Sequence, residues 1–329
     1  MSRIDVIEFY SGIGGMHYAL KEACQNSHVV AAYDINTTAN LIYAYNFPNT
    51  PICQNNIQAV SIEHLEKLNA YLWTMSPPCQ PFTKKGSQLG LDDHRCDSFM
   101  ALLEKLKQMR NRPRCIFLEN VVGFETSLAQ KHLLSTLSEL NYGYKEFILS
   151  PHQFGVPNSR PRYYLLACSD WNSEGAAEEI HTSFGSCHIP KPQEIRYFLE
   201  ESPCDKHLYL KKDVLQKYGQ AIDVVTFNST RSACFTKSYG SYISGCGSYF
   251  CSRSELVNCQ HLDPQALVDG ELLQDVIRLF SPREVANLMC FPKEFEQPPD
   301  ASDKQMYRCL GNSVNVRVVA ALLGELLQI

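Results

Sequence analysis

The stretch IDVIEFYSGIGG, Ile4 to Gly15, joins an apolar run to a glycine-rich loop. Residues 4–10 have the pattern of a buried strand, and the amphipathic run Met16–Cys24 predicts a helix directly after the loop. A strand, a glycine turn and a helix in this order are typical of a parallel sheet covered by helices. The stretch therefore predicts an α/β fold in which a ligand can approach the backbone at the carboxyl edge of the sheet.

The same alternation continues along the chain to about residue 170. Further strands are expected at 29–34, 72–75, 115–119 and 163–167, and helices at 36–46, 98–109 and 129–140. This order predicts a doubly wound, mixed and mostly parallel sheet.

The composition and the hydrophobic periodicity of the sequence change after residue 170, which predicts a second domain. Residues 170–190 are polar and rich in Gly and Ser, as in a linker, and the periodicity is weak up to residue 277. Order returns at Ser281–Glu284, which has the pattern of a capping box, and the apolar tail 314–329 predicts a last helix that packs back on the first domain. The expected domains are 1–185 together with 278–329, and a small irregular domain at 186–277.

The composition is that of an ordinary globular protein, with 44% hydrophobic and 20% charged residues in 329. The start of the chain has no signal-peptide pattern, and no apolar run approaches the ~20 residues of a membrane span. We therefore expect a cytoplasmic protein, with the nucleus as a further location, and no membrane partner. The net charge of −5 means that any surface for nucleic acid must be local.

The cysteines are expected to be reduced thiols. The chain has 14 of them but no C-x-x-C pair, so we expect neither disulfides nor a metal site. The turn SPPCQPFT, Ser76–Thr83, is different because prolines frame Cys79 on both sides. Rigid framing suits a thiol that must aim its sulfur at a substrate, so Cys79 is the candidate nucleophile.

The glycine loop and Asp34 together suggest the cofactor. A dinucleotide fingerprint needs a third glycine where this chain has His17, which disfavours a pyrophosphate. Asp34 ends the second strand, where a carboxylate takes ribose hydroxyls. This combination favours S-adenosylmethionine, and a nicotinamide oxidoreductase is the generic α/β alternative.

Two further motifs carry ionisable groups to the same edge. FLENV delivers Glu119, whose apolar neighbours predict a raised pKa that suits a proton donor; a salt-bridged or capping Glu is the alternative. Arg160 and Arg162 straddle Pro161 and are expected to point the same way, toward a phosphate or a base carbonyl. The turn LGNSVNV, 310–316, read alone, is a helix N-cap.

In their order along the chain these motifs resemble the cytosine-5 methyltransferases. FYSGIGG, Asp34, SPPCQPFT, LENV, the arginine pair, RLFSPREVANLMCFP and YRCLGNSVNV all follow the family pattern. CFTKSYGSY, Cys234–Tyr242, and Asn158 resemble the tRNA aspartate methyltransferase branch, also known as the DNA methyltransferase 2 homologues.

The resemblance implies a class I S-adenosylmethionine-dependent methyltransferase fold and a covalent mechanism. Cys79 would add to carbon 6 of a cytosine while Glu119 protonates ring nitrogen 3, Arg162 would hold the base carbonyl, and Arg160 would help to hold the loop. The implied cofactor-binding residues are Ser11, Ile13, Gly14, Gly15, Asp34, Ile57, Gln58, Ser76, Asn312 and Ser313. The implied substrate-binding residues are Lys84, Arg95, Asn120, Cys234, Phe235, Thr236, Tyr239 and Tyr242.

The resemblance also suggests the substrate and the product. A flipped base costs less in an unstacked loop, which fits a tRNA anticodon loop, with residues 84–95 as a lid and S-adenosyl-L-homocysteine as the product. We expect a monomer. A DNA cytosine-5 methyltransferase and a catalytically weak, cofactor-binding nucleic-acid adaptor are the alternatives.

Overall fold

The computed structural model describes residues 3–78, 97–172, 179–185, 190–201, 205–263, 267, 273 and 275–328. The chain divides into two compact units. The first unit comprises 1–149, 161–185 and 316–329, and the second comprises 150–160 and 186–315. These limits differ from the expected domains, because 150–160 and 278–315 belong to the second unit.

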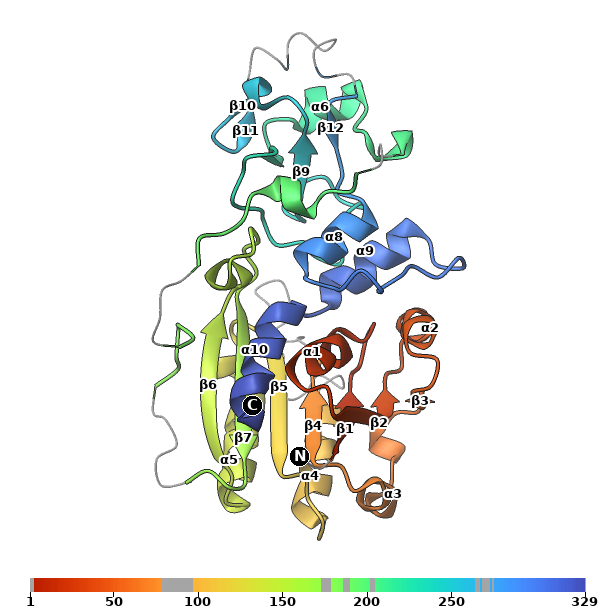
Figure 1. The fold of residues 1–329 in the computed structure, drawn as a ribbon, viewed down its shortest axis with the longest axis vertical. Coiled ribbons are helices and arrows are strands. Elements are labelled where there is room, and N and C mark those ends of the chain that lie inside the picture. The colour runs from red at the N-terminus through yellow and green to blue at the C-terminus, as the bar shows by residue number, and fades with distance from the viewer. Residues whose placement is uncertain are drawn as a thin grey trace. The chain divides into compact units, whose positions relative to one another are not determined.

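A seven-stranded sheet forms the centre of the first unit, in the order β3-β2-β1-β4-β5-β7-β6 (Figure 1). The strands are β1 Ile4–Phe9, β2 Ser27–Tyr33, β3 Ile52–Cys53, β4 Leu72–Met75, β5 Cys115–Val121, β6 Gly143–Leu149 and β7 Arg162–Cys168. Neighbours from β3 to β5 pair in parallel, whereas β7 is antiparallel to both β5 and β6. The prediction of a mixed, mostly parallel sheet is confirmed; β3 and β6 were not predicted.

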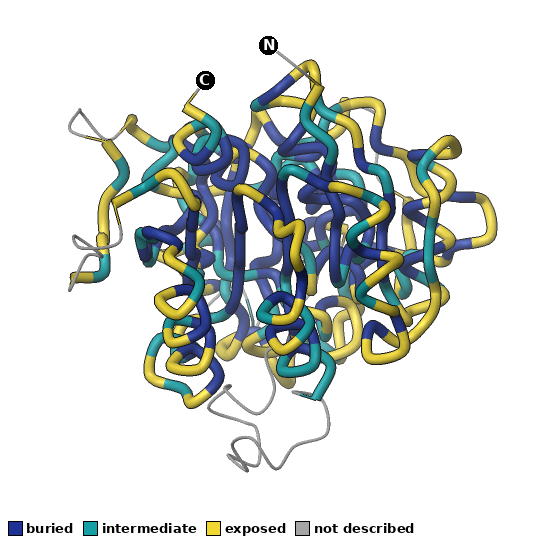
Figure 2. Tube along the Cα trace, turned by 90° about the horizontal axis from the view of Figure 1, so that it is seen from below, coloured by how far each residue is buried: buried dark blue, intermediate teal, exposed yellow. Residues whose placement is uncertain are grey.

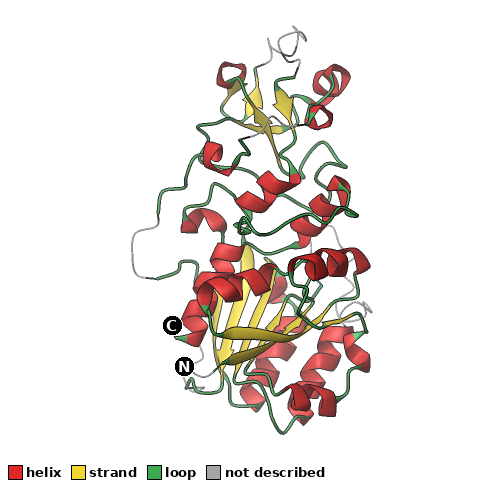
Figure 3. Ribbon diagram, turned by 45° about the vertical axis from the view of Figure 1, so that its right-hand side comes forward, coloured by secondary structure: helices red, strands yellow, loops and turns green. Residues whose placement is uncertain are grey.

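Helices cover both faces of this sheet (Figures 1 and 3). They are α1 Gly15–Ala23, α2 Thr37–Asn46, α3 Ile62–Leu68, α4 Asp97–Gln108, α5 Leu128–Glu139 and α10 Val316–Leu327. The last helix, α10, packs against α1, β5 and β7, which confirms that the tail returns to the first unit. Short 3₁₀ turns lie at η1 Ile57–Ala59 and η3 Phe124–Thr126.

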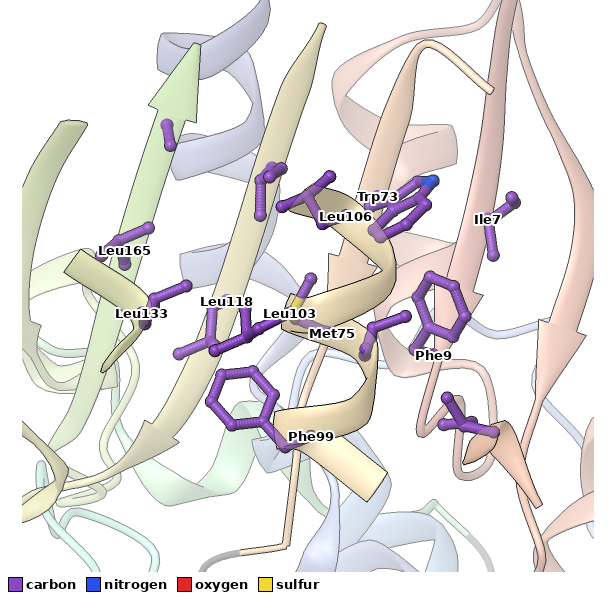
Figure 4. Close-up of a cluster of buried hydrophobic side chains, with 14 of the residues drawn as sticks. Ile7, Phe9, Trp73, Met75, Phe99, Leu103, Leu106, Leu118, Leu133 and Leu165 are labelled. Atoms are coloured by element: carbon purple, nitrogen blue, oxygen red, sulfur yellow. The ribbon is translucent and has the colours of Figure 1, made fainter. Parts of the chain in front are cut away.

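Alternate residues of the strands face opposite layers. The face toward α4 and α5 carries a cluster of buried apolar side chains (Figure 4), among them Ile7, Phe9, Trp73, Met75, Phe99, Leu103, Leu106, Leu118, Leu133 and Leu165. Because side chains alternate along a strand, Glu8 and Glu119 belong to the opposite face. All residues of β4 are buried, and so are those of β5 except its last residue, Val121; buried segments are dark blue in Figure 2.

The register of the strands brings their ends to one level. Phe9 of β1 lies opposite both Tyr33 of β2 and Met75 of β4, and Met75 lies opposite Leu118 of β5. Strand β7 runs the other way and begins at this edge, where Arg162 pairs with Val121. The loops after β1, β2 and β4, the end of β5 and the start of β7 therefore share one edge of the sheet.

The second unit is built on a small sheet with irregular connections. Its strands are β8 Asp223–Val225, β9 Ser248–Cys251 and β12 Ile277–Arg278 in the order β12-β9-β8, with β10 Val257–Asn258 paired to β11 His261–Leu262. Its helices are α6 Lys212–Tyr218, α8 Pro282–Leu288 and α9 Asp303–Asn312. The 3₁₀ turns are η4 Pro151–Phe154, η6 Ile195–Phe198, η7 Lys206–Leu208 and η8 Ser254–Leu256.

The segment after residue 277 joins the second unit for a physical reason. Arg278 pairs with Phe250 in the sheet and places its guanidinium over the Phe250 ring, with 4.7 Å to the centroid. The guanidinium also binds the buried Glu284 of α8 in a bidentate pair at 2.6 and 2.9 Å. Ser281 caps α8 with Glu284 at the third position, which confirms the predicted capping box.

Residues Asp303–Leu327 pass a test of length and composition for a membrane span. The stretch consists of α9 and α10 with residues 313–315 between them. In the tested window 61% is buried inside the structure, as in a core helix, so the stretch is weak evidence for a span.

One carboxyl group is buried beneath α1. Glu8 is 1% exposed, and its Oε2 accepts a hydrogen bond of 2.8 Å from the Tyr43 hydroxyl, which also lies 2.8 Å from Nδ1 of His17. Burial raises the pKa of Glu8 from 4.5 to about 8, with a smaller contribution from the charge of Asp34. Burial also lowers the pKa of His17 from 6.5 to about 3, so both groups are neutral near pH 7.

We expect this carboxyl to weaken the fold as pH rises. The folded protein keeps the Glu8 proton that the unfolded chain loses above about 4.5, so unfolding becomes easier up to a pH of about 8. The slope is at most about 1.4 kcal/mol per pH unit. The Glu8→Gln protein should therefore gain stability relative to wild type between pH 6.5 and 8, measured by urea unfolding. Glu22→Gln, an exposed site on α1, is the control; parallel curves for Glu8→Gln and wild type would contradict this reading.

Candidate active site

The loop after β1 has the conformation that its glycines permit. Gly14 has a φ of 83°, and a Cβ there would lie 2.5 Å from the Phe47 ring. Tyr10 also takes a positive φ of 57°, a strained value that is tolerated where the surroundings hold it. The amide of Ser11 donates to the Tyr33 carbonyl at 3.0 Å, which ties the loop to the end of β2.

Asp34 holds this loop from the neighbouring strand. Its Oδ2 accepts the Gly12 amide and its Oδ1 accepts the Asn36 amide, both at 2.8 Å. Burial raises the pKa of Asp34, and these amide hydrogen bonds act in the opposite direction. The structure thus brings Asp34 to the glycine loop, as the cofactor prediction requires, and shows that part of the carboxylate supports the loop itself.

The surroundings of the loop fit a ligand with polar and apolar parts. The Ser11 hydroxyl oxygen is buried and has no hydrogen-bond partner among the described residues. Ile35, directly after Asp34, is 71% exposed, an unusual position for a large apolar side chain at a sheet edge. Ile35 was not among the predicted cofactor residues, although its position next to Asp34 in the sequence could have pointed to it.

The other predicted cofactor residues of the first unit differ in accessibility. Ile13 and Ile57 are 2% and 4% exposed, so their side chains are part of the core. Gln58 is exposed on η1, where its side chain accepts a hydrogen bond of 2.7 Å from Asn56. Gly15 is the first residue of α1. Contacts of Ile13, Ile57 and Gln58 with a cofactor stay predictions.

The turn after β4 is held on two sides. Ser76 donates from its hydroxyl to the Tyr10 carbonyl at 3.1 Å. Asn120 donates from Nδ2 to the Pro77 carbonyl at 3.2 Å, while its Oδ1 accepts the Val121 amide. Asn120, predicted to bind substrate, is only 2% exposed and instead supports this turn. Cys79, Lys84 and Arg95 lie outside the described residues.

Glu119 and Arg162 meet on one face of the sheet at this edge. Glu119 pairs with Tyr164 in the β5–β7 ladder, and Arg162 lies two residues before Tyr164, so both side chains point to the same side. The Arg162 Nε lies 3.4 Å from the Glu119 Oε1. Their side chains are 15% and 9% exposed, so both groups are largely removed from water but remain reachable. This ion pair matches the salt-bridged alternative named for Glu119, and the roles of Glu119 as proton donor and of Arg162 toward a base carbonyl stay predictions.

The predicted substrate residues of Cys234–Tyr242 alternate between core and surface. Phe235 and Tyr239 are each 1% exposed, and their rings make an edge contact at 4.9 Å between centroids. They are core side chains in this structure, and a direct contact of either with a substrate stays a prediction. Cys234 and Thr236 are partly exposed, and Tyr242 is 68% exposed.

Arg160 does not point the same way as Arg162. Its guanidinium is 2% exposed and donates to backbone carbonyls of the second unit, at Phe235, Gly311 and Ser313. Asn312 ends α9 and Ser313 is its cap residue, so the turn predicted to bind the cofactor belongs to the second unit. Within the described residues, no group of three or more His, Cys, Asp or Glu side chains could hold a metal ion.

The chain matches the family described as C-5 cytosine-specific DNA methylase over residues 4–328. The chain belongs to this family. It is 39% identical to a protein of Spodoptera frugiperda named tRNA (cytosine(38)-C(5))-methyltransferase, over 98% of this chain and 99% of the other. It is 36% identical to a Dictyostelium discoideum protein named DNA (cytosine-5)-methyltransferase, over 99% of this chain and 95% of the other.

A solved structure agrees with these sequence matches. The crystal structure of a DNMT2 mutant from Spodoptera frugiperda has a TM-score of 0.85 and 38% identity, covering 98% of this chain and 99% of the other.

We expect Asn120 to act on catalysis through the turn that it holds. Asn120→Ala removes the hydrogen bond to Pro77, so kcat for methyl transfer should fall about tenfold to a hundredfold while the KM for nucleic acid stays near wild type. Steady-state kinetics measure both constants, with the exposed Asn111→Ala as the matched control. A raised KM with an unchanged kcat would instead restore the substrate-binding prediction.

Proposed function

We propose that the protein transfers a methyl group from S-adenosylmethionine to carbon 5 of a cytosine in tRNA, in the anticodon loop of aspartate tRNA. The observation that carries the proposal is the Glu119–Arg162 pair, 3.4 Å apart, at the sheet edge where the turn before Cys79 is anchored. The curated relatives named tRNA (cytosine(38)-C(5))-methyltransferase support the choice of tRNA.

The residues of the edge have separate tasks in this reaction. The Cys79 thiolate forms a bond to carbon 6 of the cytosine, and the displaced electron pair of the ring makes carbon 5 nucleophilic. Glu119 gives a proton or a hydrogen bond to ring nitrogen 3, while Arg162 binds the base carbonyl. After methylation, loss of the carbon 5 proton to a base breaks the bond to sulfur and regenerates the thiolate.

The cofactor would bind at the glycine loop. Ser11 and Asp34 offer polar groups, and Ile35 offers an apolar surface beside them. Bound there, S-adenosylmethionine supplies an electrophilic methyl group. The Gly14 and Gly15 backbone would allow close approach, and cofactor contacts of Asn312 and Ser313 stay predictions.

DNA is the second candidate substrate, because the Dictyostelium discoideum relative is named a DNA (cytosine-5)-methyltransferase. The two readings share the chemistry and differ in the nucleic acid. Bisulfite mapping of tRNA and of duplex DNA, each incubated with the protein and S-adenosylmethionine, separates them. Methylation confined to DNA would sink the tRNA proposal.

Two substitutions test the assigned roles. Cys79→Ala should abolish methyl transfer and leave the affinity for S-adenosylhomocysteine within about twofold of wild type, because the nucleophile only takes part in the chemical step. Glu119→Gln should lower kcat by about a hundredfold or more. Radiolabelled methyl transfer and calorimetry give these values, with the exposed Cys259→Ala as the matched control. A fully active Cys79→Ala protein would refute the covalent mechanism.

A further inference from the structure

The Arg160 guanidinium joins two segments that are far apart in the sequence. Its NH1 donates to the Phe235 carbonyl at 2.9 Å, and its NH2 donates to the carbonyls of Gly311 at 3.0 Å and Ser313 at 2.5 Å. The backbone amide of Arg160 donates to the Ser150 hydroxyl at 3.0 Å. One buried side chain therefore holds segment 234–237 and the turn at the end of α9 together.

Gly311 brings the same two segments into direct backbone contact. A Cβ at this position would lie 2.2 Å from the Lys237 nitrogen and 2.2 Å from the Thr236 carbonyl carbon. Real Cβ atoms do not approach backbone this closely, so only glycine allows the present packing. Gly311 has no positive φ and lies within α9, hence the close approach is what requires glycine here.

Both segments are also anchored elsewhere in the second unit. Phe235 packs edge-on against Tyr239 and Phe280, with centroids 4.9 and 5.5 Å away. Beyond Ser313, the buried Asn315 donates from Nδ2 to the Leu288 carbonyl at 3.2 Å, which ties the turn to the end of α8. Neither segment can shift alone without breaking buried hydrogen bonds.

We propose that Arg160 is a positioning residue that makes segment 234–237 and turn 311–313 one body. This inference rests on the proposed function, because it takes Asn312 and Ser313 as cofactor-binding residues and the partly exposed Cys234 and Thr236 as facing the nucleic acid. Arg160 itself touches neither ligand. Its role is to keep the cofactor turn and the segment facing the nucleic acid at a fixed spacing.

Arg160→Lys tests this role, because a lysine ammonium group cannot bind all three of the carbonyls that the planar guanidinium of Arg160 reaches. The dissociation constant of S-adenosylhomocysteine, measured by calorimetry without nucleic acid, should rise about tenfold to a hundredfold. The KM for tRNA, or for DNA if the wild type methylates DNA, should rise by a similar factor. Arg196→Lys, an exposed arginine of the same unit, is the control.

Gly311→Ala provides a second, independent test because it leaves Arg160 in place and forces the two backbones apart. Gly311→Ala should raise both the dissociation constant of S-adenosylhomocysteine and the KM for the nucleic acid. Gly324→Ala, where an added Cβ meets nothing within 4 Å, should raise neither. A fall in kcat with both constants unchanged in Arg160→Lys would make Arg160 a catalytic residue and overturn the proposal. Unchanged kinetics and binding in a folded Gly311→Ala protein would also overturn it. Wild-type methyl transfer decides the proposed function separately.

Discussion

The common level at which β1, β4 and β5 end is the constraint on which the site depends. Parallel pairing places Phe9, Met75 and Leu118 side by side, so the next residues, Tyr10, Ser76 and Glu119, emerge at one edge. A shift of register by one residue would turn Glu119 to the face of α4 and α5 and Asn120 to the face of α1. Chemistry and scaffold are thus specified by the same ladder of backbone hydrogen bonds.

Because side chains alternate along β5, its consecutive residues Glu119 and Asn120 make contacts on opposite faces of the sheet. Glu119 faces Arg162 on one side of the sheet, and Asn120, on the other side, reaches the Pro77 carbonyl. The carboxyl group that pairs with Arg162 and the amide that supports the turn after β4 therefore come from consecutive residues of one strand. A rigid strand holds both more accurately than a loop could.

Strong periodicity made much of the first unit predictable. The strand Leu72–Met75 and the capped helix after Ser281 agree with the structure because local pattern and burial point to the same answer there. Strand β6 was missed because Lys145 and Glu146 interrupt its apolar pattern, and β3 has only two residues. The unit boundary was missed because two-residue pairing of β12 leaves almost no sequence signal.

The site was harder to predict where partners are distant in sequence. Asn120 and Pro77 are 43 residues apart, and nothing local announces their hydrogen bond. Phe235 and Tyr239 were named as substrate-binding residues from the family resemblance alone, and in the structure both rings are buried. Long-range packing decides such positions, and single-sequence patterns do not carry that information.

The arginine pair shows how far a motif can be trusted. Arg160 and Arg162 were expected to act together because they are two residues apart, but that spacing implies a shared side only within a strand. Strand β7 begins at Arg162, so only this arginine follows the alternation that leads to Glu119. Arg160 lies before Pro161 and turns to the carbonyls of Phe235, Gly311 and Ser313. One short motif thus supplies an arginine that pairs with Glu119 and an arginine that binds backbone carbonyls, and the start of β7 separates the two.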